Sequence, residues 1–130
     1  LTRQFRALKV WMSIKEHGLD RFGRMMDRNV EQAHYLGRRV TETPDLELVA
    51  PIGLDIVCFR FNPGIEDTEV LNKLNQSLLI ALHESGVAAP SYTTLRGVYC
   101  LRAAISHHRS RFEDFDVLIQ EVVRLGRQLM

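Results

Sequence analysis

The chain has 130 residues, of which 45% are hydrophobic and 25% charged, the proportions of a soluble globular domain of ordinary size. Its formal net charge of +1 provides no strong field for nucleic acid or an anionic membrane. No apolar run reaches the roughly 20 residues that cross a bilayer, and no segment resembles a secretory leader.

The first predicted helix runs from Thr2 to His17 and is apolar on two sides. Gly18 is well placed to end it. A helix with two apolar sides needs neighbours on both, which is more cover than a terminal surface helix normally receives. One side carries Phe5, Leu8 and Met12, and the other carries Ala7, Trp11 and Ile14.

A longer helix is predicted over residues 20–41, with apolar residues every three or four positions on one side. The stretch "TETPD" ends it, because proline disfavours a helical conformation in the residue before it. Two short strands follow, "LELVAP" and "DIVCFRF", joined by a turn that contains Pro and Gly. In the second strand Val57, Phe59 and Phe61 point one way, whereas Ile56, Cys58 and Arg60 point the other.

The second half of the chain is predicted to form a helix, a hairpin and a last helix. Residues 66–85 predict a helix that ends at Gly86, and "SYTTLRGVYCLRAAI" predicts a hairpin that turns near Arg96 and Gly97. The last helix is expected to begin with a capping box from Ser110 to Glu113. The predicted class is therefore α+β: a small antiparallel sheet of two hairpins with helices packed on it, on one face.

The sequence shows no recognisable catalytic motif. The histidines lack the spacing of metal ligands, and only His107 and His108 are adjacent. There is no nucleophile elbow and no glycine-rich phosphate loop. The two cysteines lie in separate strand-like runs, so we expect free thiols and a cytoplasmic location rather than a disulfide; they are Cys58 and Cys100.

Several linked segments, taken together, resemble one enzyme family. "RQFRALKVW" followed by "HGLDRF", then "LELVAP" with "GLDIVCFRF", "LNKLNQSL" and "TTLRGVYCLRAAI", are similar in order and spacing to the group II pyridoxal-phosphate-dependent amino-acid decarboxylases. This family includes the aromatic-L-amino-acid and histidine decarboxylases. The resemblance covers essentially the whole chain.

The resemblance implies that residues 1–17 form the connecting helix from a large pyridoxal-phosphate domain, absent here, and that residues 18–130 form a C-terminal small domain. The intact enzyme would be a homodimer that decarboxylates an L-amino acid, aromatic by expectation, to its amine and CO2. The cofactor would be held by a lysine Schiff base. Lys9, Lys15 and Lys73 are the only lysines, and none matches that position. We therefore expect no catalysis by these residues alone.

The resemblance also places two residues at the substrate pocket. Thr2 stands where relatives usually have Gly or Ser, and Arg3 matches the first arginine of the family's Arg-x-Phe-Arg run. An ion pair at the domain junction is an equally good interpretation of Arg3. Arg6 and Arg102 also match family arginines, with packing and hydrogen bonding as the favoured roles.

The alternative is a stand-alone α+β module that binds a ligand or a protein. Such a module would not need cover for the first helix. RNA binding is a third possibility, with Tyr92 and Tyr99 as the candidate stacking residues, but the near-neutral charge argues against it.

Overall fold

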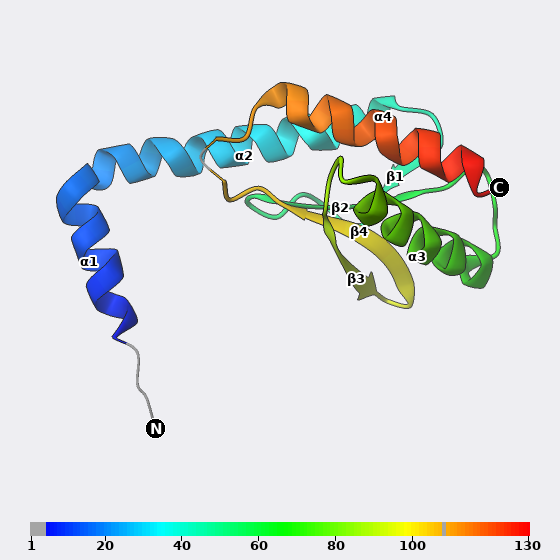
Figure 1. Ribbon diagram of the computed structural model, residues 1–130, viewed down its shortest axis with the longest axis horizontal. Helices are drawn as coiled ribbons and strands as arrows, with labels where there is room; N and C mark the ends of the chain where they lie inside the picture. The colour runs from blue at the N-terminus through cyan, green and yellow to red at the C-terminus, as the bar shows by residue number, and fades with distance from the viewer. Residues whose placement is uncertain (1–4, 108) are drawn as a thin grey trace.

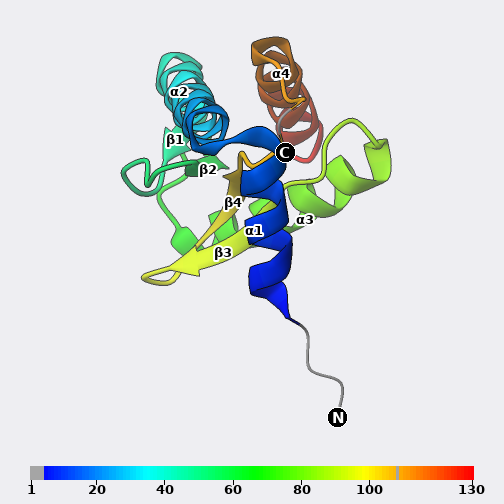
Figure 2. The ribbon, with the colours of Figure 1, turned by 90° about the vertical axis from the view of Figure 1, so that its left-hand side faces the viewer.

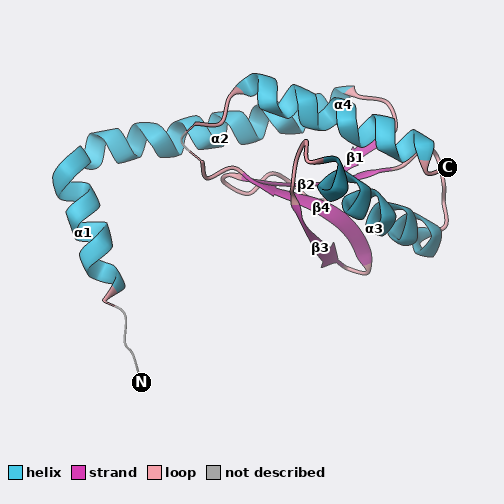
Figure 3. Ribbon diagram, viewed as in Figure 1, coloured by secondary structure: helices cyan, strands magenta, loops and turns pink. Residues whose placement is uncertain are grey.

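The computed structural model describes residues 5–107 and 109–130 and contains the elements in the predicted order (Figures 1 and 3). Each begins and ends within a few residues of its prediction. They are α1 (Arg6–His17), α2 (Leu19–Glu42), β1 (Leu46–Leu48), β2 (Ile56–Phe61), α3 (Thr68–Ser85), β3 (Ser91–Leu95), β4 (Val98–Ala104) and α4 (Phe112–Gln128).

The four strands form one antiparallel sheet in the order β1-β2-β4-β3. Each predicted hairpin pairs within itself, with Glu47 opposite Arg60 in the first and Thr93 opposite Cys100 in the second. The two hairpins join along β2 and β4, where Cys58 lies opposite Arg102. The α+β class and the two-hairpin sheet are therefore confirmed.

Helices α2, α3 and α4 lie together on one side of this sheet (Figure 2). Phe59 and Phe61 project from β2 into the layer between sheet and helices, and both are completely buried. Removing a side chain of this size from water stabilises the fold by roughly 1.5–3 kcal/mol. The same layer takes apolar residues from all three helices, among them Leu36, Leu78 and Val122.

The opposite side of the sheet carries no helix of the described chain (Figures 1 and 2). Strand alternation and register place one set of side chains there. We call this side the uncovered face; its residues include Glu47, Ile56, Cys58, Arg60, Cys100 and Arg102.

The start of α4 differs from its prediction by one residue. Arg111 is the N-cap instead of Ser110, and its backbone N–H donates to the carboxylate of Asp114 at 2.9 Å. The Ser110 carbonyl instead accepts two side-chain hydrogen bonds from α2, from Gln32 at 2.7 Å and Arg28 at 3.1 Å. This tertiary contact fixes Ser110 outside the helix, and the acidic residue three positions after the cap is Asp114 rather than Glu113.

Helix α3 contains a buried amide that apolar periodicity does not predict. Asn75 is fully buried, accepts from the Phe61 backbone N–H and donates to the Phe61 carbonyl, both at 2.9 Å. It thereby satisfies both backbone groups at the end of β2. The helix ends are conventional: Asp67 caps the first turn, and Gly86 ends the last turn in a left-handed conformation with φ 71°.

Helix α1 and the first half of α2 extend away from the sheet as a bent arm (Figure 1). The bend is at Gly18, whose φ of 80° favours glycine and whose N–H donates to the Ile14 carbonyl at 2.8 Å. No residue of α1 is buried. Among the described residues, no helix has the length and apolar character of a membrane span.

Candidate functional site

The arm concentrates the exposed apolar surface of the molecule. Phe5 is 71% exposed, Trp11 58%, Leu19 69% and Met26 67%, although all four are residue types that normally lie inside. We call residues 5–26 the arm. A contiguous apolar surface of this kind marks a contact site for another protein surface.

The inner side of the bend forms a hollow of about 430 Å³ between α1 and α2. Val10 and Ile14 contribute from α1, and Leu19, Phe22 and Met26 from α2. Lys9 and Ser13 are its polar members. The hollow suits apolar side chains of a neighbouring segment, because it offers almost no hydrogen-bonding group to orient a polar ligand.

None of the three lysines stands in a site that would hold pyridoxal phosphate. Lys9 lies at the apolar hollow of the arm, and the Lys15 ammonium lies 5.7 Å from the centre of the Trp11 ring. Lys73 borders a separate hollow with Val70, Leu74 and Met130. A Schiff-base site needs a carboxylate for the pyridine nitrogen and several donors for the phosphate. Each hollow offers one serine hydroxyl, Ser13 or Ser77, and neither is lined by a carboxylate. The described residues therefore do not fit the cofactor.

The two predicted substrate-binding residues, Thr2 and Arg3, lie outside the described residues. Arg6 is exposed at the start of α1. The guanidinium of Arg102 makes no hydrogen bond or ion pair within the described part of the chain. The hydrogen-bonding role expected for Arg102 is therefore not fulfilled by these neighbours.

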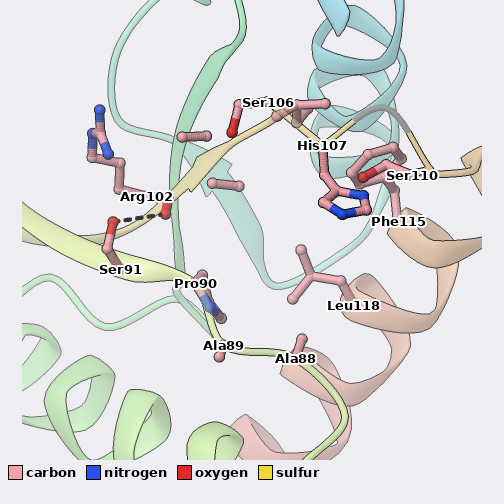
Figure 4. A pocket seen from close by; sticks show the side chains of 13 residues that line it. Ala88, Ala89, Pro90, Ser91, Arg102, Ser106, His107, Ser110, Phe115 and Leu118 are labelled. Carbon is pink, nitrogen blue, oxygen red and sulfur yellow. Dashed lines mark hydrogen bonds between the residues drawn. The ribbon is translucent and has the colours of Figure 1, made fainter. Parts of the chain in front are cut away.

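A second hollow, of about 340 Å³, lies where the end of β4 and the segment before β3 meet the start of α4 (Figure 4). Its walls are mainly apolar and include Pro90, Phe115 and Leu118. Nδ1 of His107 accepts from the backbone N–H of Arg109 at 3.1 Å, which places the proton of the neutral ring on Nε2. Arg102 points away from this hollow, toward the other side of the sheet. No carboxylate lines it, so it lacks an acid–base pair.

The perturbed ionisable groups have structural causes. Burial, followed by the neighbouring Cys58 thiol, raises the pKa of Cys100 to about 11. The hydrogen bond to Asp116, 2.6 Å long, raises the pKa of Tyr35 and ties α2 to α4. Both cysteines are free thiols. No cluster of three potential metal ligands exists among residues 5–107 and 109–130.

Comparison with known proteins shows a resemblance to one enzyme family. Residues 1–62 match the model of the pyridoxal-dependent decarboxylase conserved domain. Tyrosine decarboxylase 4 of Petroselinum crispum is 35% identical over 109 residues, which is 81% of this chain and 22% of that protein. The chain is similar to the pyridoxal-dependent decarboxylases over most of its length. The aromatic-L-amino-acid decarboxylase of Bacillus atrophaeus is 29% identical over 130 residues, 99% of this chain and 27% of that decarboxylase.

The fold is that of solved decarboxylases of this family. The Oryza sativa TDC crystal structure with PLP and tryptamine matches 98% of this chain with a TM-score of 0.87 at 23% identity. That match covers 28% of the Oryza chain. The chain thus spans about a fifth to a quarter of the decarboxylases that it resembles. This small share of the relatives' length agrees with the finding that none of the three lysines stands in a cofactor site.

Proposed function

We propose that these residues form the C-terminal small domain and connecting helix of a pyridoxal-phosphate-dependent decarboxylase that converts an aromatic L-amino acid to its amine and CO2. Residues 1–17 would be the connecting helix and residues 18–130 the small domain. Support for the reaction and for the aromatic substrate comes from relatives such as the tyrosine decarboxylase, at 35% identity.

The observation that carries the proposal is the unequal burial of apolar residues. The layer between the sheet and helices α2–α4 is closed, whereas the arm exposes Phe5, Trp11, Leu19 and Met26. Relatives are about four times longer than this chain, so a large domain is available to cover the arm. The arm's role is then to dock the small domain onto the catalytic domain of the same polypeptide.

Pyridoxal phosphate, when bound by that domain, would supply the electron sink for the electron pair that remains on the α-carbon when CO2 departs. The residues of this chain contribute position rather than chemistry. Thr2 and Arg3 would border the substrate, with the β-branched Thr2 narrowing the pocket. The arm would hold these two residues at the catalytic domain, because they come only two and three positions before Phe5, where the described chain starts.

The proposal includes a homodimer of the intact enzyme and a cytoplasmic location. The free thiols Cys58 and Cys100 accord with a reducing compartment. The homodimer follows from the family resemblance.

The test uses the protein encoded by the full reading frame that contains these residues, which we call the parent polypeptide. We expect a visible absorption band that borohydride abolishes, and formation of an amine from tyrosine, tryptophan or phenylalanine. A parent polypeptide without that band, or one that binds the cofactor but releases no amine from any of the three, would contradict the proposal. Sedimentation of the same sample measures whether it is a dimer.

A further inference from the structure

Helices α2 and α4 run side by side on the same side of the sheet (Figures 1 and 2). A hollow of about 500 Å³, which the proposed function does not use, lies between the end of α2 and the middle and later turns of α4. Its apolar part consists of Ile119, which is buried, and Val123, which is half-buried. Sites for small molecules typically occupy about 300–1,000 Å³, so this hollow has the size of such a site.

Three arginines line this hollow, and none of the described residues that line it is acidic. Arg39 comes from α2, and Arg124 and Arg127 come from α4. Thr43 and Gln120 add a hydroxyl and an amide. This combination suits an anion attached to an apolar body, because guanidinium groups bind oxyanions and the aliphatic side chains contact the rest of the ligand.

The carboxylates that pair with these arginines lie further from solvent than the guanidinium groups. Arg124 pairs with Glu121, and Arg127 pairs with Asp45. The two arginine side chains are 53% and 57% exposed, whereas those of Glu121 and Asp45 are 13% and 29% exposed. The hollow therefore presents guanidinium groups to a ligand and keeps their internal partners behind them.

The internal ion pairs leave hydrogen-bond donors unused. Arg39 donates to Asp116 from Nε alone, at 3.1 Å. Arg124 and Arg127 use Nε and Nη2 for their carboxylates. Within the described part of the chain, Nη1 of all three arginines makes no hydrogen bond. Since a guanidinium carries five N–H donors in one plane, an oxyanion can bind here without displacing an internal carboxylate.

We propose that this hollow binds a small anion, namely a phosphate monoester or a carboxylate attached to an apolar body of about the size of an aromatic ring system. The oxyanion accepts hydrogen bonds from the unused Nη groups, and the apolar body contacts Ile119 and Val123. A small molecule fits better than an acidic protein segment, because the hollow has the size of a small-molecule site. The site lies on the helix layer, and its existence does not depend on the proposed decarboxylase activity.

Calorimetric titration of the parent polypeptide, with pyridoxal phosphate in excess, provides the first test. The probes are 1-naphthyl phosphate, 1-naphthoate, inorganic phosphate and uncharged 1-naphthol. We expect at least one of the two naphthyl anions to bind about tenfold more tightly than inorganic phosphate and than 1-naphthol, and the tighter of the two identifies the acid group. Absence of binding by both naphthyl anions would overturn the proposal.

Two substitutions at one ion pair should change this affinity in opposite directions. Arg124→Gln removes donors and a positive charge, so it should weaken binding of the naphthyl anion by about tenfold. Glu121→Gln leaves the Arg124 charge without its internal partner, so it should strengthen binding by about threefold or more. If Arg124 serves only Glu121, neither substitution changes the affinity, and that result would overturn the proposal.

Two further variants test the location and the apolar part of the site. Arg111→Gln makes the same charge change at the N-cap of α4, about 20 Å from Arg124 along the helix, well beyond the screening length of about 8 Å at physiological salt. It should change the affinity by less than about twofold, and an effect equal to that of R124Q would overturn the site. Val123→Thr should weaken binding of the naphthyl anion by about threefold and leave inorganic phosphate unchanged, because it replaces a methyl group by a hydroxyl.

A second ion pair keeps the test decisive if R124Q does not fold, as judged by circular dichroism. Arg127→Gln should then weaken binding and Asp45→Asn should strengthen it, for the same reasons. A polyglutamate peptide tests the other class of occupant. Binding of this peptide without binding of either naphthyl anion would identify an acidic protein segment as the occupant and would overturn the proposal.

Discussion

The two halves of helix α2 have the same kind of sequence and opposite environments. Both halves carry apolar residues at three- and four-residue intervals. Leu36 and Val40 in the second half are completely buried, whereas Leu19 and Met26 in the first half are 69% and 67% exposed. The second half lies over the sheet and the first half does not. A periodic apolar pattern therefore predicts that one face of a helix is buried, but it does not predict which part of the protein buries that face.

The largest expected difference between the two regions concerns stability. Phe59→Ala should lower the free energy of unfolding of the 130-residue chain by about 3–5 kcal/mol, because it leaves a cavity beneath the helices. Trp11→Ala, in the arm, should change it by less than about 0.5 kcal/mol. Urea denaturation monitored by circular dichroism measures both. A cost of several kcal/mol for Trp11→Ala would show that the arm is already covered.

The exposed arm should make the 130-residue chain self-associate. Replacing Val10, Leu19 and Met26 by Ser should reduce binding of a hydrophobic dye and shift the sedimentation profile toward monomer, since these residues line the hollow of the arm. Ile80→Ser is the matched control, because Ile80 on α3 is 60% exposed, as is Val10. A chain that is monomeric and binds no dye before any substitution would contradict this interpretation of the arm.

Two helical glycines provide a smaller, opposed pair of effects. A Cβ added at Gly126 on α4 would lie 2.7 Å from the Phe61 ring, whereas one added at Gly23 in the arm meets nothing within 4 Å. Gly126→Ala should therefore destabilise the chain by about 1–3 kcal/mol, because the buried ring must move. Gly23→Ala should stabilise it by up to about 1 kcal/mol through helix propensity alone. Thermal unfolding measures the change in stability of each variant. Changes of the same sign in both variants would contradict this prediction.

The smallest effect concerns an ion pair on the outer surface of the helix layer. The hydrogen bond from Arg124 Nε, 2.9 Å long, lowers the pKa of Glu121. Because the folded pKa is depressed, this pair contributes stability above the ordinary glutamate pKa and loses it as the pH falls through the folded value. Glu121→Gln should thus differ from the unsubstituted chain at neutral pH and converge with it in acid. Stability curves from pH 2 to 7 at low salt test this, and a constant difference would exclude the pair as its cause.

Much of the fold could be predicted because the signals are local. The proline and glycine residues between elements, and the alternation of Val57, Phe59 and Phe61, were enough to place the strands and helices in order. The start of α4 was wrong by one residue, because the Ser110 carbonyl binds Gln32 and Arg28, 78 and 82 residues earlier in the chain. No local pattern contains that information.

The candidate sites were less predictable for the same reason. The need for cover on the first helix could be read from its two apolar sides. Asn75, however, looks like an ordinary helix residue until β2 ends beside it and leaves the Phe61 backbone groups to be satisfied. The unpartnered Nη1 of Arg60 likewise exists only in the folded chain, where Nε pairs with Glu47 of β1 while the fold buries Nη1 without an acceptor.

Helix α2 also has a mechanical consequence. It runs for 24 residues, about 36 Å, from the bend at Gly18 to the edge of the sheet. Because its exposed and buried halves belong to one unbroken helix, a rotation of the buried half also moves the exposed half. Gly18 connects α1 to α2, and a Cβ added there would meet nothing within 4 Å. A small angular displacement of the sheet would thus become a translation of several ångströms at the start of α2.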